Sequence, residues 1–138
     1  MQYLESSALV KRYVAEPDSS LVAAALARDP RVVTSLLTRL EVRAALAAAH
    51  RDGRLADLAA TVVRLGRDWT LVLAVAVDVT MLDDAALLTE KHALRAADAL
   101  QLASALFAAA GEPSRLPFGS FGERLNRAAA AEGFPVLF

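Results

Sequence analysis

The sequence contains no cysteine, which excludes disulfide bonds and thiolate metal sites and fits a reducing compartment. It also has little net charge, −1 at pH 7 with 15 basic and 16 acidic residues, which excludes a strongly basic nucleic-acid-binding protein. Any contact with a nucleic acid must therefore use a local group of basic side chains. With 56% hydrophobic residues, the 138-residue chain has ample material for the core of one domain, predicted to span residues 1–138.

The sequence has no long hydrophobic run. Its most apolar stretch covers residues 69–77 and ends at Asp78, whereas a membrane-spanning helix needs about 20 apolar residues. The first residues, MQYLESS, contain no basic segment followed by an apolar one, which predicts that there is no signal peptide. Together with the absence of cysteine, these features predict a cytoplasmic protein that does not contact a membrane.

Short apolar runs alternate with longer segments of helical periodicity, which is the pattern of βαβ units around a parallel sheet. The sequence predicts strands at 2–4, 31–34, 71–74, 116–119 and 135–137. It predicts helices at 7–14, 19–27, 38–50, 54–68, 79–92, 96–110 and 123–131, of which 96–110 is the most apolar and is expected at the centre. The predicted fold class is therefore α/β, a three-layer domain in which helices flank a mostly parallel sheet of about four or five strands.

Three acidic residues stand where a ligand site is expected, because parallel sheets bind ligands beyond the carboxyl ends of their strands. Glu5 directly follows the first predicted strand, Glu41 lies in the first turns of the helix after the second strand, and Asp98 opens the apolar helix at 96–110. Each also has an ordinary explanation when taken alone. Glu5 can be a polar residue that leaves a buried strand, and the other two acids can complement the positive end of a helix.

Taken together, the three carboxylates predict a site for a divalent metal ion. Mg²⁺ and Mn²⁺ are hard cations that prefer oxygen ligands, and clustered carboxylates repel one another unless a cation lies between them. Such an ion activates water and neutralises charge on a phosphodiester during its hydrolysis. The two histidines, His50 and His92, lie at helix ends in charged surroundings and are not expected to be ligands.

Four segments resemble the motifs of PIN-domain proteins, in the same order and across nearly the whole chain. They are YLESSALVK at 3–11, SLLTRLEVRAA at 35–45, HALRAADALQLA at 92–103 and FGSFGERLNRA at 118–128, and the third is the most specific. The resemblance implies the PIN fold and, for a short chain, a toxin of the VapC type. Such a toxin would be an endoribonuclease that uses Mg²⁺ or Mn²⁺, cuts RNA, is inhibited by a VapB-type antitoxin and forms a homodimer.

The resemblance also implies roles for individual residues. Glu5 and Asp98 would be the main metal ligands, and Glu41 would complete or orient the site. Ser7 would hydrogen-bond near the metal or the first acid, and Ser120 would support the fourth motif. Basic residues that lie near the acids in sequence, each otherwise a solvated surface charge, are candidates to bind the RNA backbone: Lys11, Arg12, Arg39, Arg43 and Arg95.

Two positions depart from the PIN pattern. The first acid of the family is Asp, and here it is Glu5, whose extra methylene moves the carboxylate by roughly 1 Å. The fourth motif normally has Asp two residues after its Ser or Thr, and here Gly122 holds that position. Because three acids remain instead of four, an alternative stays open: a catalytically impaired PIN scaffold that binds antitoxin or RNA without cutting.

Two further alternatives come from other classes of protein. A different phosphate enzyme fits less well, because the sequence has neither the GxxxxGK[ST] nor the GxGxxG motif, and a haloacid-dehalogenase-like nucleophile would need Asp where Glu5 and Ser7 stand. A purely structural partner protein also stays open. Its apolar, alanine-rich helices at about 7–27 and 38–69 are expected to form a groove that takes a helix of a partner such as an antitoxin.

Overall fold

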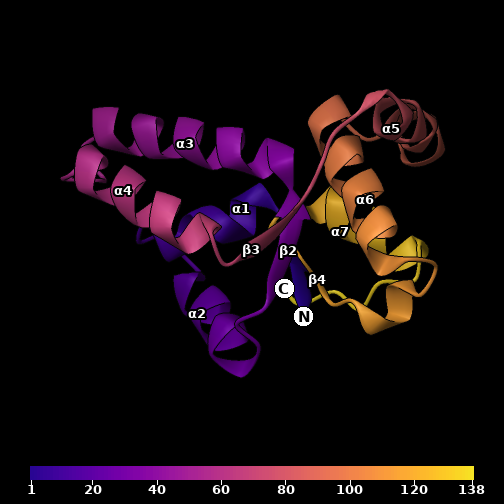
Figure 1. Cartoon of the computed structure of the whole chain (residues 1–138), viewed down its shortest axis with the longest axis horizontal. Helices are drawn as coiled ribbons and strands as arrows, with labels where there is room; N and C mark the ends of the chain where they lie inside the picture. Colours follow the sequence, from indigo (N-terminus) through magenta and orange to yellow (C-terminus); the bar gives the residue numbers. More distant parts are fainter.

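The computed structural model describes residues 1–138 and arranges them in three layers (Figure 1). The middle layer is a parallel four-stranded sheet in the order β3-β2-β1-β4, whose strands are β1 (Gln2–Leu4), β2 (Val32–Ser35), β3 (Val72–Val75) and β4 (Phe118–Gly119). The predicted α/β class is confirmed. The strand predicted at 135–137 is reduced to a single parallel bridge between Phe118 and Val136.

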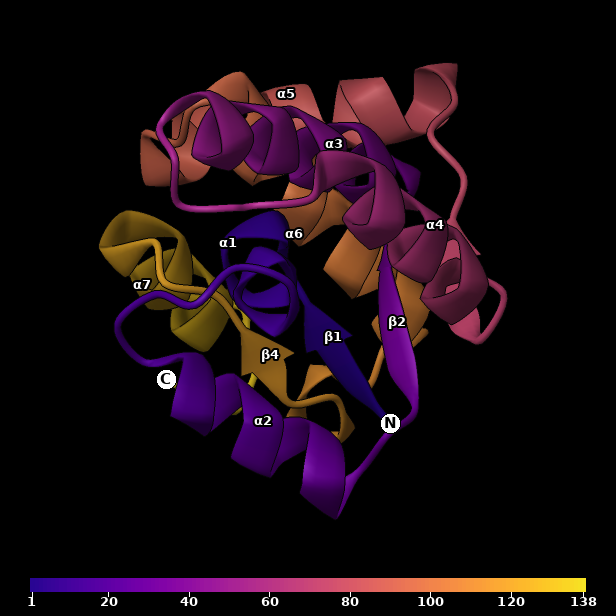
Figure 2. The same cartoon turned by 90° about the vertical axis from the view of Figure 1, so that its left-hand side faces the viewer.

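Helices cover both faces of the sheet. One face carries α1 (Ser6–Leu9), the 3-10 turn η1 (Val10–Arg12), α2 (Ser19–Arg28), α3 (Leu36–Arg51) and α4 (Leu58–Trp69). The other carries α5 (Val79–His92), α6 (Ala96–Ala109) and α7 (Glu123–Ala131), with a second 3-10 turn, η2 (Pro113–Arg115), before β4. Figure 1 shows the two groups on opposite sides of the strands, and Figure 2 shows β1 between β2 and β4.

Side chains of the strands alternate between the two helical layers. Tyr3 and Val33 belong to the core shared with α5, α6 and α7, whereas Leu4 and Val32 belong to the core shared with α1 to α4. All four are buried, as expected for a parallel sheet that is covered on both faces. Helix α6 is central as predicted, since its residues 99 and 101–105 are all buried.

Capping residues explain where the helices begin. Helix α4 starts at 58 and not at 54 as predicted, because the carboxylate of Asp57 accepts the N–H of Ala60 at 2.9 Å and so caps the helix there. Helix α3 starts earlier than predicted, because Ser35 both ends β2 and caps α3. The chain therefore passes from β2 into α3 without a loop, which brings the start of α3 to the carboxyl end of the sheet.

No helix combines the length and the apolar character that crossing a membrane requires.

Candidate active site

The three predicted acids come from three elements and meet at the carboxyl end of the sheet. Glu5 lies between β1 and α1, Glu41 in the second turn of α3, and Asp98 in the first turn of α6. Burial raises the pKa of the Glu5 carboxyl, and the negative charges of Glu41 and Asp98 raise it further. The structure thus brings together three carboxylates that are 36 or more residues apart in sequence.

Glu5 is the most buried of the three acids and serves as the N-cap of α1. Its Oε2 atom accepts the backbone N–H of Ser7 at 2.8 Å and the Ser7 hydroxyl at 2.6 Å. These hydrogen bonds lower the pKa of Glu5, but the effect of burial is larger and the net shift is upward. The Ser7 hydroxyl also accepts the N–H of Phe121 at 2.8 Å, which ties the first acid to the segment after β4.

Glu41 is held at one oxygen by two hydrogen bonds. Its Oε2 atom accepts the Ser6 hydroxyl and, at 2.7 Å, the side-chain amide of Gln101. Neither Ser6 nor Gln101 was predicted as a site residue. A signal was nevertheless present for Gln101, because it is a polar residue in the most apolar helix and lies one turn after Asp98, on the same side.

Asp98 is partly accessible, with 30% of its side chain exposed. Its nearest cation is Arg95, whose Nε atom lies 3.6 Å from Oδ2 and whose side chain is 90% exposed. An ion pair this exposed contributes little, so Asp98 remains available to a ligand. The positive end of α6 stabilises its charge.

The donor atoms fit a hard divalent cation in kind, but their arrangement in this structure does not form a closed metal centre. Carboxylate oxygens are the ligands that Mg²⁺ prefers, and each acid keeps at least one oxygen without a hydrogen bond to the protein. No group of three or more acidic or histidine side chains is positioned to hold an ion. In this arrangement Oε2 of Glu5 is bonded to Ser7, and Oε2 of Glu41 is bonded to Ser6 and Gln101.

The segment after β4 lies against the first acid but brings no further carboxylate. Ser120 is fully buried, and its Oγ atom accepts the N–H of Gly122 at 2.9 Å. Gly122 is the N-cap of α7 and has no side chain to cap it. The next residue, Glu123, is largely exposed and pairs with Arg127, so it points away from the other acids.

A family comparison identifies the fold that carries these acids. The family model described as PIN domain matches residues 3–130. The chain belongs to the PIN-domain family. The resemblance found in the four sequence motifs is thereby confirmed.

Curated relatives and a solved structure agree with this membership. Ribonuclease VapC45 of Mycobacterium tuberculosis (strain CDC 1551 / Oshkosh) is 38% identical to this PIN domain over 97% of the chain and 92% of its own length. Ribonuclease VapC49 of Mycobacterium tuberculosis (strain ATCC 25618 / H37Rv) has the same identity and coverage. A chain of a structure titled toxin-antitoxin complex from Klebsiella pneumoniae covers 100% of this chain and 97% of its own at a TM-score of 0.66, and at 16% identity it supports the fold alone.

Two of the five basic candidates of this PIN domain are engaged inside the protein. The Nζ atom of Lys11 donates to Glu16 at 3.2 Å and to the carbonyl of Pro17 at 2.8 Å, and it lies 4.6 Å from the centre of the Phe121 ring. Arg12 pairs with the carboxylate of Asp68 on α4 at 2.9 Å. An RNA phosphate would have to compete with these existing partners.

The other three basic candidates are exposed, but only one lies beside the acids. Residues two apart in a helix point about 200° away from each other, so Arg39 and Arg43 project from the side of α3 opposite Glu41. Arg95, in contrast, contacts Asp98 directly. The structure therefore brings Arg95 to the carboxylates and does not bring the two arginines of α3 there.

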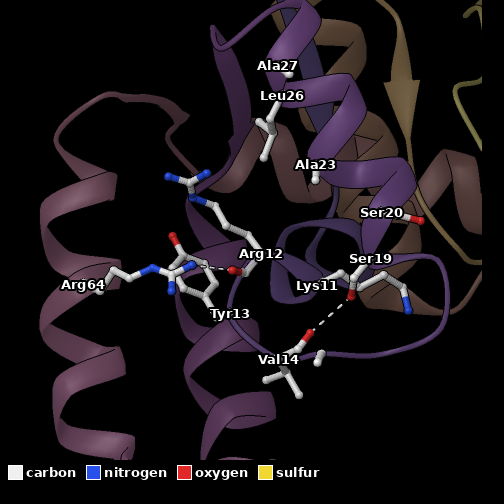
Figure 3. A pocket seen from close by; sticks show the side chains of 11 residues that line it. Lys11, Arg12, Tyr13, Val14, Ser19, Ser20, Ala23, Leu26, Ala27 and Arg64 are labelled. Carbon is white, nitrogen blue, oxygen red and sulfur yellow. Dashed lines mark hydrogen bonds between the residues drawn. The ribbon is translucent and has the colours of Figure 1, made fainter.

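A groove of about 650 Å³ lies between η1, α2 and α4 of the PIN domain. Its apolar lining comes mainly from Val14, Ala23 and Leu26, and its rim carries basic side chains, among them Arg64 of α4. Figure 3 shows α2 along one side of this groove and Arg12 and Arg64 on the other. The groove lies on the face where the sequence predicted a surface for a partner helix.

Proposed function

We propose that this PIN-domain protein is a VapC-type toxin that hydrolyses phosphodiester bonds of RNA, with Mg²⁺ or Mn²⁺ held by Glu5, Asp98 and Glu41. The observation that carries the proposal is the convergence of these three acids at the carboxyl end of the sheet. It is supported by two relatives, 38% identical over 97% of the chain, that are named ribonucleases. The protein is expected to act in the cytoplasm, where its RNA substrate is found.

Each protein group has a defined part in this proposal. A bound divalent ion supplies an activated water and neutralises charge on the phosphodiester. Asp98 offers its partly exposed carboxylate at the positive end of α6. Glu5 would ligate an ion through its Oε1 atom, because both hydrogen bonds from Ser7 are accepted by Oε2. Arg95, whose Nε atom lies 3.6 Å from Asp98, would meet a phosphate beside that carboxylate.

The test is a cleavage assay with antitoxin-free protein and folded RNA in Mg²⁺, in Mn²⁺ or in EDTA. Asp98→Asn should lower the cleavage rate on the order of 100-fold or more. Glu123→Gln is the matched control, because Glu123 is an exposed acid outside the cluster, and it should leave the rate unchanged. Cleavage that persists in EDTA, or that survives in Asp98→Asn, would contradict the metal-dependent nuclease.

A second candidate function is a PIN scaffold that binds antitoxin or RNA without cutting. It is favoured by Glu5 in place of Asp, by the missing carboxylate at Gly122, and by the absence of a closed group of ligands. This candidate predicts that the wild-type protein binds its partners but cleaves no RNA in either metal. Restoring Asp at both positions should then raise metal affinity and activity.

We also propose that the groove between η1, α2 and α4 takes a helix of a VapB-type antitoxin. Its apolar floor and basic rim fit an amphipathic helix with acidic residues along its edges. Leu26→Asp should weaken antitoxin binding by about 10-fold or more without changing RNA cleavage by free toxin. A basic antitoxin side chain that reaches Glu5 and Asp98 would complete the inhibition, and a complex unaffected by Asp98→Asn would argue against that contact.

The proposed homodimer has a candidate surface on α5 and α6. Leu87 is 65% exposed and Phe107 is 70% exposed, and both line a groove of about 460 Å³. Asp84 and Lys91 flank Leu87 on α5, and Lys91 pairs with Glu132 of its own chain at 2.7 Å. In an antiparallel second copy each Asp84 would approach the other Lys91 and add to this pair. Sedimentation analysis should find a dimer that Leu87→Asp converts to a monomer, and a monomeric wild type would refute this part.

A further inference from the structure

We infer that Gln101 is a positioning residue of the proposed RNA-cleaving site, because its side-chain amide fixes the Glu41 carboxylate and leaves only the Oε1 atom of Glu41 free for a ligand. The inference rests on the proposed function and deepens it, since it assigns a role to a residue outside the acidic cluster. If Gln101 fixes Glu41 in this way, Glu41 would offer a metal ion one carboxylate oxygen instead of two.

Gln101 lies at the centre of a buried hydrogen-bond network that joins β1, α1 and α3 to α6. Its Oε1 atom accepts the phenol of Tyr3 at 2.7 Å. Its Nε2 atom lies 2.7 Å from Oε2 of Glu41, 2.9 Å from Oγ1 of Thr38 and 3.0 Å from Oγ of Ser6. A single side chain of the central helix therefore contacts three other elements around the site.

The proton of each hydroxyl in this network can be assigned from its partners. Thr34 has one proton and lies 2.6 Å from the carbonyl of Leu4, which can only accept, so Thr34 donates there. Thr34 must then accept the proton of Thr38, 2.7 Å away. Because the proton of Thr38 is used in this way, its oxygen is an acceptor for the amide of Gln101.

The orientation of the Gln101 amide is set by the partners at its two ends. The fully buried phenol of Tyr3 lies 2.7 Å from Oε1 of Gln101, an amide oxygen that can only accept, so the phenol donates its proton there. A reversed amide would put its carbonyl oxygen against the carboxylate of Glu41, where two acceptors repel. The Nε2 atom therefore faces Glu41, and its two hydrogens are shared among Glu41 and the neighbouring hydroxyls.

Two donors consequently converge on Oε2 of Glu41, the amide of Gln101 and the hydroxyl of Ser6. Buried networks in which every member is satisfied hold their side chains in one arrangement. Since Asp98 and Gln101 are three residues apart on α6, one helix supplies an acid of the site and also holds a second acid in place. Partners that orient a ligating carboxylate typically contribute about 10- to 100-fold to metal affinity or activity.

The experiment compares Gln101→Leu with Gln2→Leu. Gln2 is a matched control, because it is also a buried glutamine whose amide donates two hydrogen bonds, to the carbonyls of Ala25 and Asp29, but at the opposite end of β1. Both variants lose a buried amide, and only Gln101→Leu loses a contact with Glu41. The measurements are the Mn²⁺ dissociation constant by electron paramagnetic resonance, and kcat and KM for RNA cleavage.

We expect Gln101→Leu to weaken Mn²⁺ binding by about 10- to 100-fold and to lower kcat with little change in KM for RNA. Gln2→Leu should leave all three quantities close to the wild-type values. If the two variants behave alike, Gln101 is only a structural residue and the inference is overturned. If Gln101→Leu does not fold, Ser6→Ala removes the other donor to Glu41 and should weaken Mn²⁺ binding in the same direction, and unchanged binding would overturn the inference.

A separate readout decides the inference if the proposed function itself fails. Gln2 and Gln101 are the only glutamines in the chain, so their carboxamide signals are easily assigned in ¹⁵N-labelled protein. The Gln101 protons should exchange slowly in the wild type and rapidly in Glu41→Ala, while the Gln2 protons stay unchanged. A wild type that neither binds Mn²⁺ nor cleaves RNA would refute the proposed function, whereas a Gln101 signal insensitive to Glu41→Ala would refute the positioning role.

Discussion

Replacing Glu5 with Asp is expected to change activity far more than stability. Glu5 caps α1 through the two hydrogen bonds that its carboxylate accepts from Ser7. Asp is among the best N-cap residues, and a good cap contributes about 1 kcal/mol to the free energy of unfolding. The substitution also removes one buried methylene, whose loss costs about 0.8 kcal/mol. The two contributions oppose each other, so we expect a net change below about 1 kcal/mol.

The expected limit on the change in the free energy of unfolding corresponds to a limit on the change in melting temperature (Tm). A chain of 138 residues has an unfolding entropy of about 0.3 kcal/mol/K, so the change in Tm should stay below about 4 °C. Differential scanning calorimetry in EDTA measures it without a contribution from metal binding.

The effect on catalysis has a different origin. The shorter side chain draws the first carboxylate back by roughly 1 Å relative to Glu41 and Asp98, and a displacement of that size can change a rate by on the order of 100-fold. Because the PIN pattern has Asp at this position, we expect Glu5→Asp to cleave labelled RNA about 10- to 100-fold faster under single-turnover conditions in Mn²⁺. Glu123→Asp makes the same chemical change at an exposed acid and should alter neither rate nor Tm.

Two outcomes would refute this reasoning. A Glu5→Asp variant that folds within the stated limit but cleaves more slowly would mean that the longer side chain is fitted to this site. A loss of more than about 2 kcal/mol in the free energy of unfolding would mean that the cap does not offset the lost methylene.

Three further changes test separate features. Because burial raises the pKa of Glu5, its charged form destabilises the fold above that raised pKa. Glu5→Gln should therefore increase the free energy of unfolding in EDTA at pH 7.5 but not below about pH 4. Urea titrations of wild type and variant that differ equally at both pH values would contradict this. Gly122→Asp adds a side chain whose Cβ would lie 3.3 Å from Oγ of Ser120, a contact that needs only a small shift. In scanning fluorimetry, Mn²⁺ should raise the Tm of this variant more than the Tm of the wild type. Equal shifts would show that the new carboxylate does not reach the ion. Asp68→Asn removes the charged partner of Arg12, an ion pair that joins α4 to η1. Since Arg12 is partly exposed, urea unfolding should detect a decrease of at most about 1 kcal/mol in the free energy of unfolding. A larger decrease would mean that this ion pair is a main stabilising contact of the groove.

Much of the fold could be predicted from helical periodicity, and at α5 a capping residue agrees with it. The helices predicted at 79–92 and 123–131 are observed with the same bounds as α5 and α7. Asp78 marks the start of α5, where its carboxylate accepts the N–H of Met81 at 2.9 Å. The strand predicted at 135–137 forms only one bridge, because a short apolar run does not reveal whether the edge of the sheet accepts it.

The candidate site could be predicted less completely than the fold. Its acids are visible from sequence because they follow strands or open helices and match the motifs. The contact between Gln101 and Glu41 is not visible from sequence, because the two residues are 60 positions apart and no local pattern pairs their side chains. Arg43 shows the converse, because this neighbour of Glu41 in sequence lies on the other side of the helix.

The position of α6 has a consequence for how the protein can be controlled. This helix carries Asp98 and Gln101 and is also packed at the centre of the core against α5, α7 and the sheet. The amides of its buried residues 99 and 101–105 are therefore expected to exchange with deuterium only when the whole domain unfolds, whereas regions that switch by local melting exchange early. Loosening of this helix alone is therefore not expected to turn the proposed site off. We expect an inhibitor of that site to act from outside, by covering the carboxylates or by supplying a positive charge to them.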